Sequence, residues 1–183
     1  MSRLLIAPLL LLLSAASPAQ QKFTSIRQVD FKNFTYPLDK SFGVPTTWGW
    51  MPLPVHSTFD LVNGRHDSLG FDLVATAYGN IGNQEVAAVD VSYSTGATAN
   101  WRYLFLYELE DGQPKLMGWL RSGSRAYGGL IRTAFQDGLL VLDFEDASKR
   151  EGDCCSDAYI RVSYRWHNDR FTEVSPRQSG TLK

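Results

Sequence analysis

The sequence predicts an all-β protein whose antiparallel strands form a meander, folded into a curved sheet or a barrel-like domain. Short segments alternate apolar and polar side chains, which is typical of strands with one buried face. Turn sequences separate these segments about every eight to twelve residues. Outside the N-terminal leader, no long segment has the apolar spacing of an amphipathic helix.

The clearest predicted strand spans residues 101–110. A side-chain period of two places alternate residues on the same face of a sheet. The even positions run from Arg102 through two leucines to Glu108 and Glu110. We therefore expect the odd positions to face the core: Trp101, Tyr103, Phe105, Tyr107 and Leu109.

Residues 1–19 have the features of a secretory signal helix that is cleaved after Ala19. Arg3 supplies the positive start, residues 4–13 are an apolar run too short to span a bilayer, and small residues precede the cleavage point. Cleavage after Ala16 and an uncleaved N-terminal anchor are the alternatives. No cysteine lies nearby, so there is no lipobox. We expect a secreted or periplasmic protein without stable membrane insertion after cleavage.

Residues 20–183 form a single predicted β-rich domain. The chain of 183 residues is 44% hydrophobic and 13% aromatic, which is enough for a packed core. Its formal net charge is −1, and loss of Arg3 with the leader makes it −2. This balance gives no reason to expect nucleic acid or an anionic membrane as a partner.

The N-terminal part of this domain contains one predicted strand and one sequon. Residues 26–31 alternate in the manner of a strand. Asn33 begins an Asn-Phe-Thr sequence that a glycosylating host can modify. The alternative, which we favour, is a solvated Asn33 side chain beside an edge strand.

Residues 38–57 are predicted to form an irregular loop, because they are rich in proline, glycine and tryptophan. Trp48 and Trp50 would share one side of an extended segment, and such aromatic platforms can bind sugars or proline-rich ligands. Alternatively, the loop folds back over the open end of a sheet. Apolar loop residues usually become buried, so the composition favours the second interpretation.

Two-residue turns and alternating strands fill the rest of the chain. Asn63-Gly64 and Asp137-Gly138 are strong hairpin signals, because both residues of a tight turn must tolerate a positive φ. Residues 71–78 and 158–166 alternate as strands, and residues 175–183 are predicted to form a loose tail.

Asp143 and Glu145 share one face of the predicted strand 139–145, and Arg161 and Arg165 share one face of a later strand. If the two faces coincide, the charges pair across the strands. Two neighbouring carboxylates could instead serve glycoside hydrolysis. Such a pair is common by chance, so the sequence favours a protein that is not an enzyme.

Cys154 and Cys155 are the two cysteines of the chain. Neighbouring Cα atoms lie about 3.8 Å apart, closer than in most disulfides, so a bond between them is strained but feasible. We favour a structural vicinal disulfide. The alternatives are a reduced pair, intermolecular crosslinks and a thiol-redox function. Reactive cysteines need an electropositive setting, whereas Asp153 and Asp157 place negative charges beside this pair.

No metal site or cofactor is predicted. His56, His66 and His167 are scattered, without acidic or cysteine ligands at suitable spacing. Residues 79–85 resemble the FG-GAP calcium loop, but asparagines replace its aspartates and only Glu85 is charged. The resemblance therefore implies a turn of that shape without the metal.

A second resemblance covers more of the chain. It is carried by Gly-Asp-Cys-Cys-Ser at 152–156, Tyr-Arg-Trp at 164–166 and Arg170-Phe171, with further pieces at 93–98 and 125–129. This ending resembles uncharacterised bacterial secreted proteins, including the LppP/LprE-like lipoproteins. The resemblance implies export and a β-rich fold, with no established activity.

The sequence thus favours a secreted or periplasmic, non-enzymatic domain that binds an unknown extracellular ligand or envelope partner. The expected contact surface comprises Trp48, Trp50, Tyr127 and the Cys154-Cys155 turn. The alternatives are a secreted hydrolase that uses Asp143 and Glu145, and a thiol-redox protein that uses the two cysteines.

Overall fold

The structure, a computed structural model, describes residues 22–38, 50–51, 57–67, 70–94, 100–123, 128–149, 156–168 and 170–182. Residues 1–19 lie outside this part of the chain. Antiparallel strands dominate it, and the helical elements described are two single 3₁₀ turns, η1 (Ile26–Gln28) and η3 (Ala147–Lys149). The all-β prediction is confirmed. No helix in the described ranges is long and apolar enough to cross a membrane.

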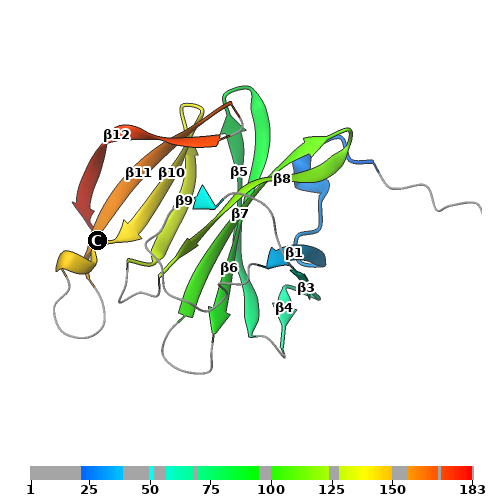
Figure 1. Cartoon of the computed structure of the whole chain (residues 1–183), viewed down its shortest axis with the longest axis horizontal. Helices are drawn as coiled ribbons and strands as arrows, with labels where there is room; N and C mark the ends of the chain where they lie inside the picture. Colours follow the sequence, from blue (N-terminus) through cyan, green and yellow to red (C-terminus); the bar gives the residue numbers. More distant parts are fainter. Residues whose placement is uncertain are drawn as a thin grey trace, which may run out of the picture.

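The strands form three sheets (Figure 1). In spatial order, the six-stranded sheet contains β2 (Trp50–Met51), β8 (Gln113–Ser122), β7 (Asn100–Glu110), β6 (Gln84–Ser94), β5 (Phe71–Ile81) and β4 (Arg65–His66). The four-stranded sheet contains β12 (Arg170–Thr181), β11 (Ala158–His167), β10 (Leu139–Glu145) and β9 (Leu130–Gln136). The third sheet pairs β1 (Phe34–Leu38) with β3 (Ser57–Leu61).

Both larger sheets are antiparallel meanders, as predicted. Strands β4 to β8 follow one another in the chain and in space, and they curl strongly into a half-barrel (Figure 1). The four-stranded sheet lies on one side of this curled sheet, and β1, β3 and η1 lie on the other. The architecture is therefore two meanders packed together, with N-terminal segments covering the far face.

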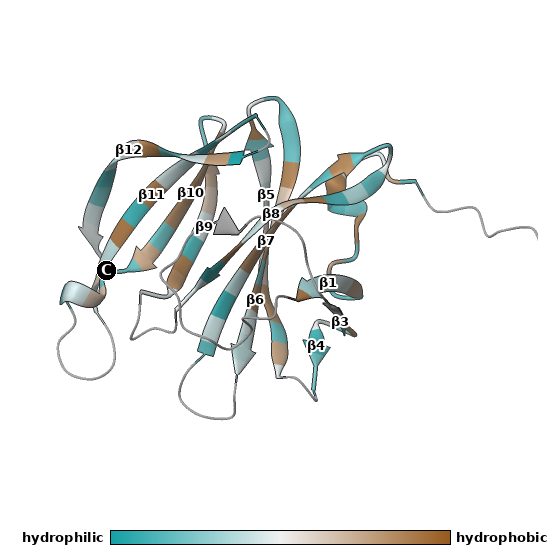
Figure 2. Ribbon diagram, viewed as in Figure 1, coloured by the Kyte–Doolittle hydropathy of each residue, from teal (hydrophilic) through white to brown (hydrophobic). Residues whose placement is uncertain are grey.

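Strand β7 is buried on both faces, which corrects the expectation of a single buried face. Its odd positions join an aromatic core with η1, β1 and β3. Leu104 and Leu106 join a second core with the four-stranded sheet. Strand β10 begins with four hydrophobic residues (Figure 2), and side chains of β10 and β11 belong to this second core: Leu140, Leu142, Phe144, Val162 and Tyr164.

In place of the strand predicted at 26–31, Ile26–Gln28 form a 3₁₀ turn, and residues 29–31 are irregular. The Ser25 hydroxyl accepts a hydrogen bond from the Arg27 backbone N–H, and the Gln28 side chain accepts from the Ser25 backbone, which is a capping box. This local pairing competes successfully with an extended backbone. Ile26 still faces the aromatic core, and the strand itself begins at Phe34.

The predicted two-residue turns are confirmed. Asn63, Gly64, Asp137 and Gly138 all have a positive φ, between 52° and 82°. The alternation predicted for 71–78 fails, however, because the pairing of β5 with β6 shifts register between Leu73 and Ala75. Such a bulge reverses the faces of all later residues in the strand.

The loose tail predicted at 175–183 is wrong for its described residues up to Thr181. Strand β12 continues to Thr181, and its last four residues pair with β11 in unbroken register. The sequence did not predict this strand because it contains Pro176 and Gly180, which are unusual within strands. Pro176 lies where the register shifts and on an edge strand, the two settings in which a sheet tolerates proline. Gly180 lies directly under the Tyr159 ring, where a side chain would clash.

The predicted irregular loop at 38–57 lies largely outside the described residues. Within it, Trp50 and Met51 form β2 and pair with Leu120 and Trp119 of β8. This segment of the loop therefore returns to the edge of the six-stranded sheet.

Candidate functional site

The two large sheets meet closely at one end. The Gly82 N–H, in the turn between β5 and β6, donates a 3.1 Å hydrogen bond to the Gly138 carbonyl in the turn between β9 and β10. Nearby, Gly79 packs directly against Phe135, with no room for a side chain on Gly79. At the opposite end, where β7 and β9 begin and β10 ends, the Leu130 N–H of β9 donates a 3.0 Å hydrogen bond to the Ser122 hydroxyl at the end of β8.

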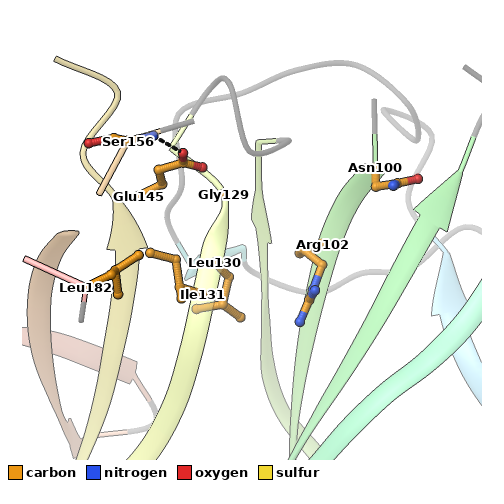
Figure 3. Close-up of a pocket in the computed structure, with 8 residues that line it drawn as sticks. All are labelled: Asn100, Arg102, Gly129, Leu130, Ile131, Glu145, Ser156 and Leu182. Atoms are coloured by element: carbon orange, nitrogen blue, oxygen red, sulfur yellow. Dashed lines mark hydrogen bonds between the residues drawn. The ribbon is translucent and has the colours of Figure 1, made fainter. Parts of the chain in front are cut away.

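Two adjoining cavities lie between the sheets towards this second end, and together we call them the inter-sheet cleft. The cavity at the strand ends, which we call the mouth cavity, has a volume of about 310 Å³. The cavity further along the same strands, which we call the inner cavity, has a volume of about 230 Å³, and both are open to solvent. Arg102 and Ile131 line both, and Figure 3 shows Arg102 across from Leu130 and Ile131. The mouth is also lined by Asn100, Gly129, Glu145, Ser156 and Leu182, and the inner cavity by Val74, Ala77, Ala88, Asp90, Arg132 and Thr133.

Asp90 and Arg102 form a buried ion pair in the cleft. The Arg102 Nε donates to Asp90 Oδ1 at 2.8 Å, and Nη2 donates to Oδ2. Asp90 is 5% exposed, and its burial raises the pKa of its carboxyl, against the hydrogen bond and charge of Arg102. Arg102 Nη1 has no partner among the described residues.

Asp143 accepts hydrogen bonds from Arg161 Nε and Nη2 at 2.7 and 2.9 Å, which confirms the predicted cross-strand pair. Arg132 on β9 adds a third contact, with its Nε 2.9 Å from Asp143 Oδ2. Asp143 is almost fully buried beneath these two guanidinium groups. Arg165 pairs in register with Thr172 and makes no ion pair with the described residues.

Glu145, the second predicted carboxylate, lies at the mouth of the cleft. Its Oε1 accepts a hydrogen bond from the Ser156 backbone N–H, drawn in Figure 3. Asp143 does not line the cleft, and its carboxylate is held by Arg132 and Arg161. The two carboxylates are therefore not presented together to a substrate.

Thr133 contributes an unusual polar atom to the inner cavity. Its Oγ1 is buried and has no hydrogen-bond partner. Buried hydroxyl groups nearly always have a partner, so this orphan atom calls for an explanation.

Most of the contact surface expected from the sequence lies outside the described residues: Trp48, Tyr127, Cys154 and Cys155. The backbone of Trp50 lies in β2, an edge strand of the six-stranded sheet that β8, β7 and β6 separate from β5. Gly129 and Ser156, which line the mouth, are close neighbours in sequence of Tyr127 and Cys155. The cleft residues Asp90, Arg102, Arg132 and Thr133 were missed by sequence reasoning, although Asp90 and Arg102 stand out as lone charges among apolar strand residues.

The FG-GAP-like loop at 79–85 and the Asn33 sequon both belong to turns of the fold. Residues 79–85 form the β5–β6 hairpin, whose two strands pair as far as Ile81 and Gln84. No cluster of His, Cys, Asp or Glu in the described ranges is arranged to hold a metal ion. The Asn33 side chain donates to Asp30 Oδ2 at 2.7 Å and accepts from the Asn63 N–H at 2.9 Å, so it joins two turns.

The fold and cleft define an all-β domain with a cleft between two antiparallel sheets, lined mainly by apolar side chains with a few charged ones. Comparison with protein-family models, with curated proteins and with solved structures found no match.

Proposed function

We propose that the chain is an exported, non-enzymatic β-domain that binds a ligand in the inter-sheet cleft. The observation that carries the proposal is the cleft itself, two adjoining cavities with apolar walls and a few convergent polar groups. Binding sites for small molecules have this character and occupy roughly 300–1,000 Å³. The mouth and inner cavities together fall within that range.

The state of the acidic side chains favours binding over hydrolysis. In the cleft, Asp90 is held by Arg102, and Glu145 accepts a hydrogen bond from the backbone at Ser156. A general base needs a carboxylate within reach of the reacting proton. No observation favours the alternative hydrolase based on Asp143 and Glu145, and the thiol-redox alternative rests on residues outside the described ranges.

Filling the cleft is expected to abolish ligand binding. Ile131 lines both cavities and is 37% exposed, so an Ile131→Trp side chain can occupy the cleft without entering the core. In a fragment screen by protein-observed NMR, wild-type hits should shift the amide resonances of residues 74–77 and 130–133. Ile131→Trp should weaken these hits at least about tenfold.

Val62→Trp is the matched control, because Val62 is 65% exposed and lies in neither cavity. It should bind the same fragments as the wild type. Hits that map elsewhere, or that bind Ile131→Trp unchanged, would remove the cleft from consideration.

Export is tested by the mass of the chain recovered from the periplasm or medium of an expressing bacterium. The features of residues 1–19 predict a product that begins at Gln20. The same measurement with and without reductant should show a gain of two hydrogens if Cys154 and Cys155 are bonded. Full-length protein retained in the cytoplasm would contradict export.

A further inference from the structure

We propose that an extended peptide segment of a partner protein binds in the inter-sheet cleft by adding a strand to the open edge of β5. The inference rests on the proposed function, because it names the chemistry of a ligand held in the same cleft. It is supported by the backbone of the β5 edge, by the way this edge borders the inner cavity, and by the apolar side chains beside it.

One edge of β5 is open along most of the strand. The other edge pairs with β6 over the whole strand. On the open side, β4 pairs with the first two residues of β5, and the Leu73 N–H donates to the Gly64 carbonyl at 2.7 Å. From 74 to 81, no backbone hydrogen bond on this side joins β5 to the described residues. A bulge can blunt such an edge, but this strand is regular after its bulge, because its pairing with β6 is unbroken from Ala75 to Ile81.

The open edge of β5 forms a wall of the inner cavity. Four consecutive residues of β5, 74–77, and three consecutive residues of β9, 131–133, line this cavity. Consecutive side chains of a strand point to opposite faces, so an unbroken run of lining residues means that the backbone edge itself borders the space. Strand β9 is the edge strand of its own sheet. The inner cavity therefore lies between two strand edges.

The β5 edge is also accessible from its other side. A hollow of about 350 Å³ is lined by residues 29–32 and by β5, and residues 74–76 line both this hollow and the inner cavity. Strands β5 and β9 come together where Gly79 packs against Phe135, and they diverge towards the mouth (Figure 1). The space beside the β5 edge thus widens towards the mouth, which gives an incoming chain a route to it.

Apolar side chains along the cleft indicate the character of the peptide. Within the described ranges, four large apolar side chains are exposed, and three of them line the cleft: Val74, Ile131 and Leu182. Apolar side chains that gather at one exposed place mark a contact site for a partner. A polypeptide supplies donors and acceptors at the spacing of a strand edge, and its alternate side chains can contact these residues. The expected ligand is therefore an extended peptide with apolar side chains.

The test selects peptides and then alters their backbone alone. Seven-residue peptides displayed on phage are selected on the immobilised protein, and the enriched peptides are synthesised for calorimetry. We expect apolar, β-branched sequences that slow hydrogen exchange at alternate amides between residues 74 and 79. Methylating the backbone nitrogen of every second peptide residue removes half of the donors and leaves every side chain in place. At least one of the two alternate patterns should weaken binding about tenfold or more.

Two lysine variants locate the peptide. Ala75→Lys places a charge on the open edge of β5, a device by which natural sheets prevent strand addition. Ala75 is exposed, so the fold should be retained, and peptide binding should weaken about tenfold or more. Thr172→Lys adds the same charge to an exposed position of β12, the edge strand on the opposite side of the four-stranded sheet from β9, and should leave affinity unchanged.

The outcomes separate this inference from the proposed function. Strand addition is wrong, and the binding function stands, if both methylated patterns bind as tightly as the parent peptide or if the two lysine variants behave alike. The same holds if no peptide is enriched while the fragments bind in the cleft. If sedimentation shows a dimer that Ala75→Lys dissociates, the β5 edge binds a second copy of the chain, and the partner peptide is wrong. If neither peptides nor fragments bind in the cleft, both proposals fail.

Discussion

Replacing Phe105 or Leu106 with alanine is expected to destabilise the protein by comparable amounts, although the two side chains point in opposite directions. Phe105 packs against Tyr36 and Trp119 in the aromatic core, whereas Leu106 packs in the core between the two large sheets. Both are at most 1% exposed. Truncation should lower the free energy of unfolding by about 3–5 kcal/mol for Phe105→Ala and about 2–5 kcal/mol for Leu106→Ala.

Chemical denaturation followed by tryptophan fluorescence and circular dichroism measures these changes. Val62→Ala is the control, because its exposed side chain should contribute less than about 0.5 kcal/mol. If Leu106→Ala costs no more than Val62→Ala, the four-stranded sheet does not cover that face of β7 in solution. The comparison therefore tests the packing of the two sheets, and not simply the presence of a core.

The sequence pattern of β7 predicted the burial of one face only, although both faces are buried. Alternation identified the odd face correctly, because all five odd positions from 101 to 109 are apolar or aromatic. Whether the even face is also covered depends on the four-stranded sheet, whose strands lie further along the chain. The pair Leu104 and Leu106 was the available signal, since strands buried on both faces become nearly continuous apolar runs.

Local chemistry explains the two segments that were predicted wrongly. At 26–31, the capping box of Ser25 and Gln28 outweighs an alternation that would equally suit a strand. At the C-terminus, Pro176 and Gly180 are typical of irregular chain, yet the edge position of β12 and the Tyr159 ring above Gly180 accommodate them. The C-terminal outcome depends on partners that the local sequence does not identify, whereas the Ser25-x-x-Gln28 spacing of the capping box is visible in the sequence.

The candidate site was predicted in part. Asp143 and Arg161 were matched correctly, because each belongs to a clearly alternating strand and the strands are neighbours. Asp90 and Arg102 were not matched, because they are diagonal neighbours across β6 and β7, and a diagonal contact requires the exact register. The register follows from the pairing of Ser94 with Asn100, across a loop whose length alone does not determine it.

The largest electrostatic effect is expected from Arg102→Met, which leaves Asp90 buried without its partner. Removing one member of a buried ion pair typically costs about 3–5 kcal/mol, and the flexible methionine keeps most of the packing volume. Asp90 is 5% exposed, so water cannot readily replace the two lost hydrogen bonds. Urea denaturation at pH 7 should show this loss relative to the wild type.

The loss should shrink as the pH falls. Burial raises the pKa of Asp90 above its ordinary value of 3.8, and Arg102 opposes that rise. Without Arg102 the pKa of the folded state rises further, so the folded protein binds a proton more tightly than the unfolded chain. A carboxyl with a raised pKa makes a stabilising contribution that is fully present below pH 3.8. This contribution is lost as the pH rises through the pKa of the carboxyl in the folded state. The deficit of Arg102→Met is therefore greatest at neutral pH.

The double variant Asp90→Asn/Arg102→Met provides the control. It has no carboxyl at position 90, so its stability relative to the wild type should depend much less on pH above 3.8 than that of Arg102→Met. It should also be more stable than Arg102→Met at pH 7, because a neutral amide is less costly to bury than a charge. A deficit of Arg102→Met that stays constant with pH, or that the second substitution deepens, would mean that Asp90 is open to water and that the cleft is wetter than its geometry indicates.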